Sequence, residues 1–204
     1  RANWMYWLCL FPTDIITQEI NRAARSYFRK SGISSVYALP PLVPVAQLQH
    51  PVSKEAVEKA LPEHFETVSF AHAELGRALI YFPLLPETLI SNLRSACNKT
   101  LPILAPENSD QLLSSAPGIF FCALKAPQAS SPQTSVNSLD PADTYLPHKL
   151  GVQNSPAQYG NVRFSIGVIK ITTLSHNVSW ITCCRWSIEW KIPFNKLPFQ
   201  TGKS

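Results

Sequence analysis

The sequence predicts an α+β domain built from two strand–helix–strand lobes whose mostly antiparallel sheets face one another. Long apolar runs followed by helix signals indicate buried strands, and alternating apolar and polar residues near the C-terminus indicate further strands. A short pattern of strand, helix and proline-led strand occurs twice, which indicates an internal duplication. With 45% hydrophobic and 15% charged residues the chain can bury one sizeable core, so a single bilobal domain is expected over residues 1–204.

The first buried strand is predicted over residues 3–12, where an unbroken apolar run ends at a proline. A helix over residues 14–31 follows, because Thr13 can serve as its N-cap and Gly32 as its stop. The helix has an apolar face formed by Ile16, Ile20, Ala23, Ala24 and Tyr27, and an arginine face formed by Arg22, Arg25 and Arg29. We interpret the arginine face as the solvated side of an amphipathic helix, with phosphate contact as the alternative.

The middle of the chain predicts an extended segment, two helices and a hairpin. Residues 33–48 are extended and rich in proline, and a short helix over residues 53–61 begins at a serine cap and ends before a proline. Residues 65–83 predict two antiparallel strands that turn near Gly76. A further helix over residues 86–97 begins at a proline and has its apolar side at Leu89, Ile90, Leu93 and Cys97.

The C-terminal part predicts a loop followed by two strands. Residues 127–160 begin with an uncharged, polar stretch and predict a flexible loop. Strands are predicted over residues 162–171 and 179–194, joined by a hairpin loop. Alternation in the second strand predicts one inward face made of Trp180, Cys184, Trp186, Ile188, Trp190 and Ile192. We interpret these tryptophans as core residues, with a platform that stacks nucleic-acid bases as the alternative.

Charge and cysteine content limit the classes of function. The formal net charge is +5, and residues 161–204 hold six Lys or Arg against one acid, which we interpret as ordinary solubility, with phosphate attraction as the alternative. The five cysteines form no Cys-x-x-Cys pair and accompany no histidine cluster, so we expect no metal and a reducing, cytoplasmic location. We expect no cofactor because no glycine-rich phosphate loop is present, and no apolar run reaches the length of a membrane span.

The internal duplication carries a family resemblance. The letters CLFP at residues 9–12 recur as IYFP at residues 80–83, and YALPP at 37–41 is echoed by CALKAP at 122–127. This order of elements resembles the two-histidine (2H) phosphoesterase superfamily, which includes the 2′-5′ RNA ligase-like proteins and the cyclic phosphodiesterases. The resemblance implies two pseudosymmetric lobes that each supply a His-x-Thr/Ser strand. One histidine then acts as base and the other as acid on a cyclic phosphate, without a metal.

The positions that match the two family motifs lack the reactive groups. In PPLVPVA, Leu42 stands at the histidine position and Pro44 at the hydroxyl position. In PGIFFCA, Gly118 and Phe120 stand at the corresponding positions. None of these four residues has a side chain that transfers a proton or donates a hydrogen bond to a phosphate oxygen. No histidine of the chain is followed two residues later by Ser or Thr, so no shift of the alignment restores a motif.

We therefore predict a non-catalytic relative of the 2H phosphoesterases that serves as a binding module. The resemblance implies a groove lined by Leu42, Pro44, Gly118 and Phe120, which is more apolar than that of active members. Such a groove suits a peptide, another protein or a small apolar ligand. RNA or a nucleotide is an alternative ligand, with anion-binding candidates at Lys125, Arg163 and Arg185.

Two other functions stay open. One is an active, RNA-processing cyclic phosphodiesterase whose acid and base lie at unexpected positions, for which His64 and His72 are the candidates beside carboxylates. The other is a structural or assembly protein that uses the outer face of the strand around residues 183–191 as an interface.

Overall fold

A computed structural model describes residues 3–62, 69–70, 74–75, 79–116, 118–122, 163–173 and 184–193. The loop predicted over residues 127–160 and the turn predicted near Gly76 lie outside the described residues. Within the described ranges, no helix is both long and apolar enough to cross a membrane.

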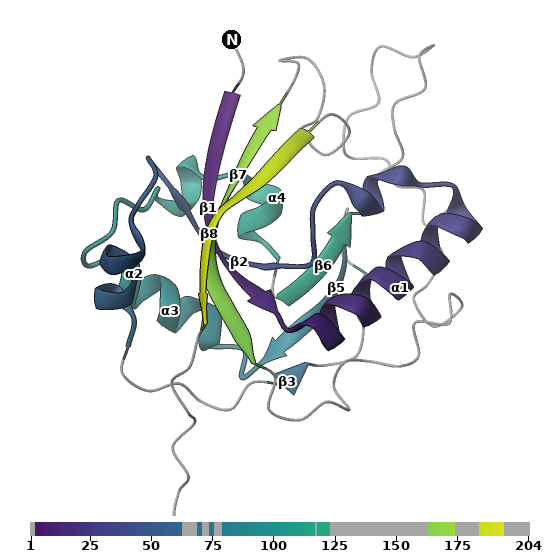
Figure 1. Ribbon diagram of the computed structural model, residues 1–204, viewed down its shortest axis with the longest axis horizontal. Helices are drawn as coiled ribbons and strands as arrows, with labels where there is room; N and C mark the ends of the chain where they lie inside the picture. The colour runs from purple at the N-terminus through teal and green to yellow at the C-terminus, as the bar shows by residue number, and fades with distance from the viewer. Residues whose placement is uncertain are drawn as a thin grey trace, which may run out of the picture.

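A four-stranded antiparallel sheet in the order β2-β1-β7-β8 forms the centre of the molecule (Figure 1). Its strands are β1 (Asn3–Pro12), β2 (Val43–Leu48), β7 (Phe164–Thr173) and β8 (Cys184–Pro193). β1 and β7 pair along their whole length, from Asn3 opposite Thr173 to Pro12 opposite Phe164. The beginning of the chain and its C-terminal part therefore meet in the middle of this sheet.

A second group of strands is built on β5 (Leu79–Leu85), which pairs antiparallel with β3 (Ser69–Phe70), β4 (Glu74–Leu75) and β6 (Gly118–Cys122). The predicted antiparallel pairing within residues 65–83 is confirmed for β4 with β5, whereas β3 pairs with Leu84 and Leu85, beyond the predicted strands. The α+β class with antiparallel strands is also confirmed. The duplication of the lobes around a central groove stays a prediction.

The helices follow the predicted signals closely. α1 (Asp14–Ser31) ends at Gly32, whose positive φ of 71° suits a residue without a side chain, and the Gly32 amide donates to the Phe28 carbonyl. α3 (Leu89–Cys97) begins a few residues later than predicted. The remaining helices are η1 (Ser34–Tyr37), α2 (Lys54–Ala60), η2 (Pro106–Asn108) and α4 (Gln111–Ser114). α4 has no counterpart in the sequence prediction.

The two predicted serine and threonine caps differ, which allows a matched test. The Ser53 Oγ accepts a hydrogen bond from the Ala56 amide at 3.2 Å, whereas the Thr13 side chain makes no cap bond. We expect Ser53→Ala to lower the free energy of unfolding by about 1 kcal/mol, and Thr13→Ala to lower it by less than about half of that. Urea titrations followed by far-UV circular dichroism measure both, and equal losses in the two variants would contradict the assignment.

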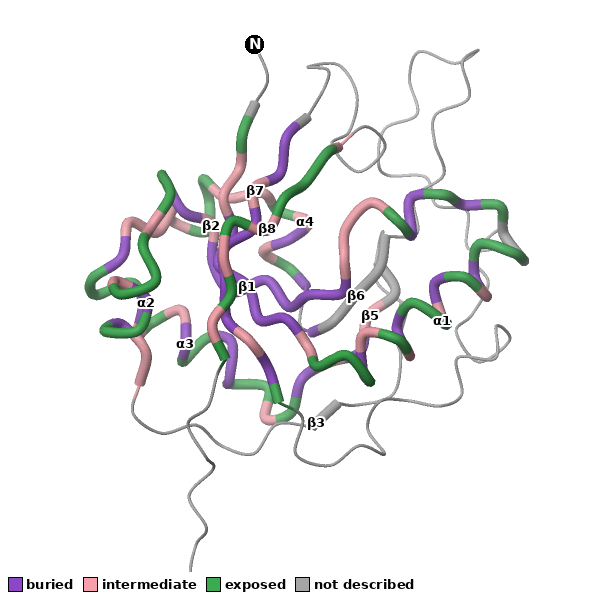
Figure 2. Tube along the Cα trace, viewed as in Figure 1, coloured by how far each residue is buried: buried purple, intermediate pink, exposed green. Residues whose placement is uncertain are grey.

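The core consists of two apolar clusters on opposite faces of the central sheet. Figure 2 shows many of the buried segments, in purple, gathered at this sheet. The first cluster packs α1, α2 and α3 against the even-numbered side chains Leu8, Leu10, Ile166 and Val168. The second cluster gathers the odd-numbered side chains Trp7, Cys9, Ile169 and Ile171 with residues from outside the sheet. β1 over residues 7–11 and β7 over residues 166–169 are therefore buried on both faces, as the apolar run within residues 3–12 predicts for β1.

The predicted common inward face of β8 is wrong. Trp190 and Ile192 pack against the first cluster, whereas Cys184 and Ile188 pack against the second. Trp186 is 42% exposed and is no core residue. Trp180, the remaining member of the predicted face, lies outside the described residues.

A β-bulge explains the difference. Val168 lies opposite Trp190, but the next residue of β7, Ile169, lies opposite Ile188, so Glu189 has no partner on β7. One extra residue in a strand reverses which of its side chains point to each face. The alternating letters of β8 are therefore split between the two sides of the sheet.

Candidate functional site

The position that matches the first family histidine lies inside the second apolar cluster. Leu42 comes immediately before β2 and is 1% exposed. It packs in one cluster with Trp7 and Ile169 from the sheet and Leu113 from α4. A side chain in this place is held by packing and has no contact with water.

The space around Leu42 is closed. It is enclosed by Trp7, Cys9, Leu39, Leu42, Pro44, Leu113, Ile169 and Ile171, and it has no room for a water molecule. Pro44, which stands at the hydroxyl position, is buried and lies opposite Cys9 of β1. The described part of this region therefore offers packing but no cavity for a ligand.

Cys9 is the titratable group in this closed space. Burial raises the pKa of its thiol far above the usual value, and a backbone hydrogen bond at Val45 opposes this shift without offsetting it. The sulfur stays a neutral thiol, and a thiol without thiolate character is a poor nucleophile. Cys9 acts here as a small buried apolar residue.

The position that matches the second family histidine has no space for any side chain. Gly118 is buried at the start of β6 and pairs with Pro83 of β5. A Cβ atom on Gly118 would overlap the carbonyl group of Phe82 and lie 2.9 Å from the Leu84 nitrogen. The backbone of Phe120 pairs with Tyr81, and its side chain is outside the description.

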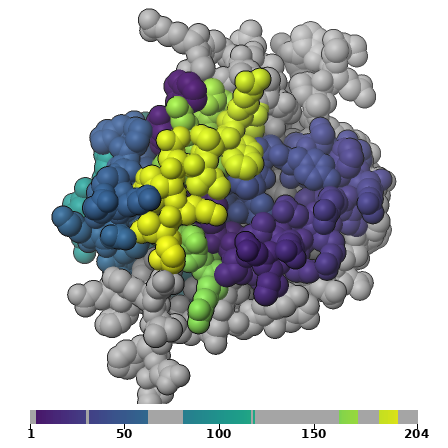
Figure 3. All heavy atoms as spheres, in the orientation of Figure 1, coloured from purple at the N-terminus to yellow at the C-terminus, as the bar shows by residue number. Residues whose placement is uncertain are grey.

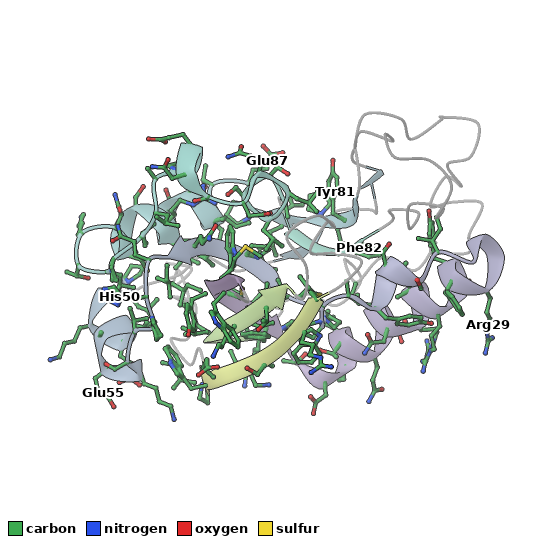
Figure 4. All side chains as sticks on the ribbon, turned by 90° about the horizontal axis from the view of Figure 1, so that it is seen from above. Arg29, His50, Glu55, Tyr81, Phe82 and Glu87 are labelled. Carbon is green, nitrogen blue, oxygen red and sulfur yellow. The ribbon has the colours of Figure 1, made fainter. Side chains whose placement is uncertain are left out.

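The predicted cationic residues do not converge on these positions. Arg163 and Arg185 are both exposed. Arg163 immediately precedes β7, whereas Arg185 pairs with Thr172 near the other end of that strand. The two side chains are therefore separated by almost the whole length of β7. Lys125, His64 and His72 lie outside the described residues. His50, the histidine that is described, lies beside α2 at the end of the molecule away from Tyr81 and Phe82 (Figure 4).

A different surface brings aromatic and basic side chains together. The aromatic–basic face, as we call it, consists of Trp4, Tyr6, Lys170 and Arg185. Tyr6 pairs with Lys170, and Thr172 pairs with both Trp4 and Arg185, so the four side chains share one face of three adjacent strands. The Lys170 Nζ lies 3.6 Å from the centre of the Trp4 ring and 5.8 Å from that of Tyr6.

This face is open to solvent. Trp4, the second residue of β1, is 53% exposed, whereas the strand is buried from Trp7 onward. Figure 3 shows β8 uncovered on the surface, with the first residues of β1 beside its upper end. One sequence signal could have located this face. Trp4 and Tyr6 are two residues apart, so in a strand both side chains lie on the same face.

Comparison with known proteins leaves the family open. No family model, no curated protein and no solved structure matches this chain. In the part of the chain that is described, no group of three or more His, Cys, Asp or Glu side chains is placed to hold a metal ion.

Proposed function

We propose that this chain is a non-catalytic, 2H phosphoesterase-like binding module. The observation that supports the proposal is the burial of Leu42, which fills the position of a family histidine within a closed apolar cluster. General acid or base catalysis needs a titratable group in contact with the substrate. Neither Leu42 nor Gly118 offers one, and the packing around both positions leaves no space for a phosphate.

The binding surface in this proposal is the aromatic–basic face, because the predicted groove residues Leu42 and Pro44 surround no free space. The ligand class that suits this face is single-stranded nucleic acid. Proteins of that type combine exposed aromatic rings, on which bases stack, with cations that contact the phosphates. Trp4 supplies the ring, Lys170 and Arg185 supply the cations, and the net charge of +5 favours approach of a polyanion.

Fluorescence anisotropy of a labelled ten-nucleotide single-stranded RNA tests the proposal. We expect binding that weakens between 50 and 200 mM salt, because phosphate contacts release counterions. Trp4→Ala is expected to weaken binding at least about fivefold, since one stacked base contributes about 1–3 kcal/mol. The matched control is Trp186→Ala, which removes an exposed tryptophan that pairs with Ile171 and so lies on the opposite face. Equal effects of the two substitutions, or no binding at 50 mM salt, would contradict this choice of surface.

The two competing functions are tested on the same protein. Incubation with 2′,3′-cyclic nucleotides is expected to give no turnover above a buffer blank. Turnover that disappears in His64→Ala or His72→Ala would overturn the non-catalytic part of the proposal and leave the RNA-binding part standing. Light scattering over a concentration series tests the assembly function, and a mass that rises with concentration would favour it.

A further inference from the structure

Trp7 contains a buried hydrogen-bond donor without an acceptor. The side chain is 1% exposed, and its Nε1 has no hydrogen-bond partner in the described structure. A buried N–H group that has lost its water and gained no acceptor destabilises the fold, so native proteins rarely contain one. An acceptor that is not part of the described chain would resolve this imbalance.

Trp7 also lines a small cavity at the outer edge of β2. The cavity is bordered by Gln47 of β2, Arg94 of α3, Ser109, which precedes α4, and Ser114, the last residue of α4. Its free volume of about 10 Å³ is enough for one atom the size of a water molecule. The cavity is independent of the aromatic–basic face, and an inference drawn from it goes beyond the proposed function.

Arg94 brings an uncompensated positive charge to this cavity. Its Nε donates to the Val45 carbonyl at 2.8 Å, which fixes the guanidinium against the edge of the sheet. The side chain is half-buried, and burial lowers the pKa of the guanidinium below its usual value. No carboxylate lies within ion-pair distance of Arg94 among the described residues. A half-buried cation without a carboxylate partner favours a nearby anion.

The other polar groups around the cavity can also donate hydrogen bonds. The Gln47 Oε1 already accepts from the Asp110 amide at 2.7 Å, which leaves its NH₂ group to donate. The Ser109 hydroxyl donates to the Ala105 carbonyl, and within the described structure the Ser114 hydroxyl has no bond. The residues that line this space, Trp7 and Arg94 included, therefore carry several hydrogen-bond donors and one positive charge.

We propose that this cavity is a binding site for a small monovalent anion, either a halide or one oxygen of a carboxylate group. The bound atom accepts from the Trp7 indole and neutralises Arg94. Water can also accept from the indole, but it leaves the charge of Arg94 uncompensated.

Two-dimensional NMR of the tryptophan indole N–H groups tests this site. The Trp7 signal is assigned by its absence in Trp7→Phe, and the protein is titrated with sodium chloride or sodium acetate at constant ionic strength, balanced with sulfate. We expect a saturable shift of the Trp7 signal. Trp190, whose Nε1 donates to the Val52 carbonyl at 3.0 Å, is the internal control and is expected not to respond.

Substitution of Arg94 provides the second measurement. We expect Arg94→Gln to weaken the saturable shift at least tenfold and Arg94→Lys, which keeps the charge, to retain part of it, with thermal melts confirming that both variants fold. Saturation by acetate alone identifies a carboxylate site, and saturation by both salts identifies a general small-anion site. A linear or absent Trp7 shift in the unsubstituted protein, or an equal response in Arg94→Gln, means that the cavity holds only water and overturns the proposal.

Discussion

Replacing Leu42 with alanine is expected to lower the free energy of unfolding by about 3 kcal/mol, within the 2–5 kcal/mol typical of buried leucine truncations. The lost side chain is almost completely buried, and it packs in the same cluster as Trp7 and Ile169. Strands β1 and β7 pair along their full length, so the cavity left behind cannot easily collapse. Urea unfolding of the purified variant measures the effect.

Ile15→Ala is the matched control for this substitution. Ile15 is also a large aliphatic residue, but it is 61% exposed at the start of α1, so we expect a change of about 0.5 kcal/mol or less. If Leu42→Ala cost no more than the control, the side chain would line an open groove, and the family's cleft would survive as a ligand site. The result therefore separates a filled position from an accessible one.

Gly118→Ala is expected to destabilise the protein by about 3 kcal/mol, because it inserts a methyl group where no space exists. The added Cβ would overlap the Phe82 carbonyl, and backbone atoms of a paired strand cannot move aside as a flexible side chain can. Either β6 separates from β5 or the register changes, and both lose backbone hydrogen bonds. Thermal and urea unfolding measure this loss.

Gly32→Ala serves as the comparison. A Cβ on Gly32 meets no atom within 4 Å, so this substitution adds only the strain of a positive φ, about 1–2 kcal/mol. A Gly118→Ala variant as stable as the unsubstituted protein would show that β5 and β6 can move apart. The strand could then accept a larger residue, and the conclusion that this position has no space for a side chain would be wrong.

The helices and the central strands follow from local patterns in the sequence. α1 combines an apolar face of 3.6-residue period with a glycine stop, and the structure places Ile16, Ile20 and Tyr27 in the core as this pattern predicts. The run of residues 3–12 has no polar face, which indicates a strand covered on both sides. In each case the decisive information lies within a few neighbouring residues.

Features that depend on residues far apart in the sequence could not be predicted from local sequence patterns. The bulge at Glu189 is a property of the pairing between β8 and β7. The alternation of apolar and polar residues in β8 is the same with or without it. The small cavity at β2 is lined by both Trp7 and Arg94, which are far apart along the chain. In the sequence alone, Trp7 resembles a core residue and Arg94 resembles a solvated helix residue. The closed space around Leu42 likewise depends on Leu113 from α4, a helix too short to give a periodic signal.

The strand order β2-β1-β7-β8 has a consequence for how the protein is made. β1 emerges from the ribosome well before its partner β7, which begins at Phe164, roughly 150 residues after β1 ends. At about 5–20 residues per second, translation needs on the order of ten seconds to supply that partner. During this interval β2 can cover one edge of the apolar strand while the other edge stays available to neighbouring nascent chains, so slower translation is expected to reduce the yield of soluble protein.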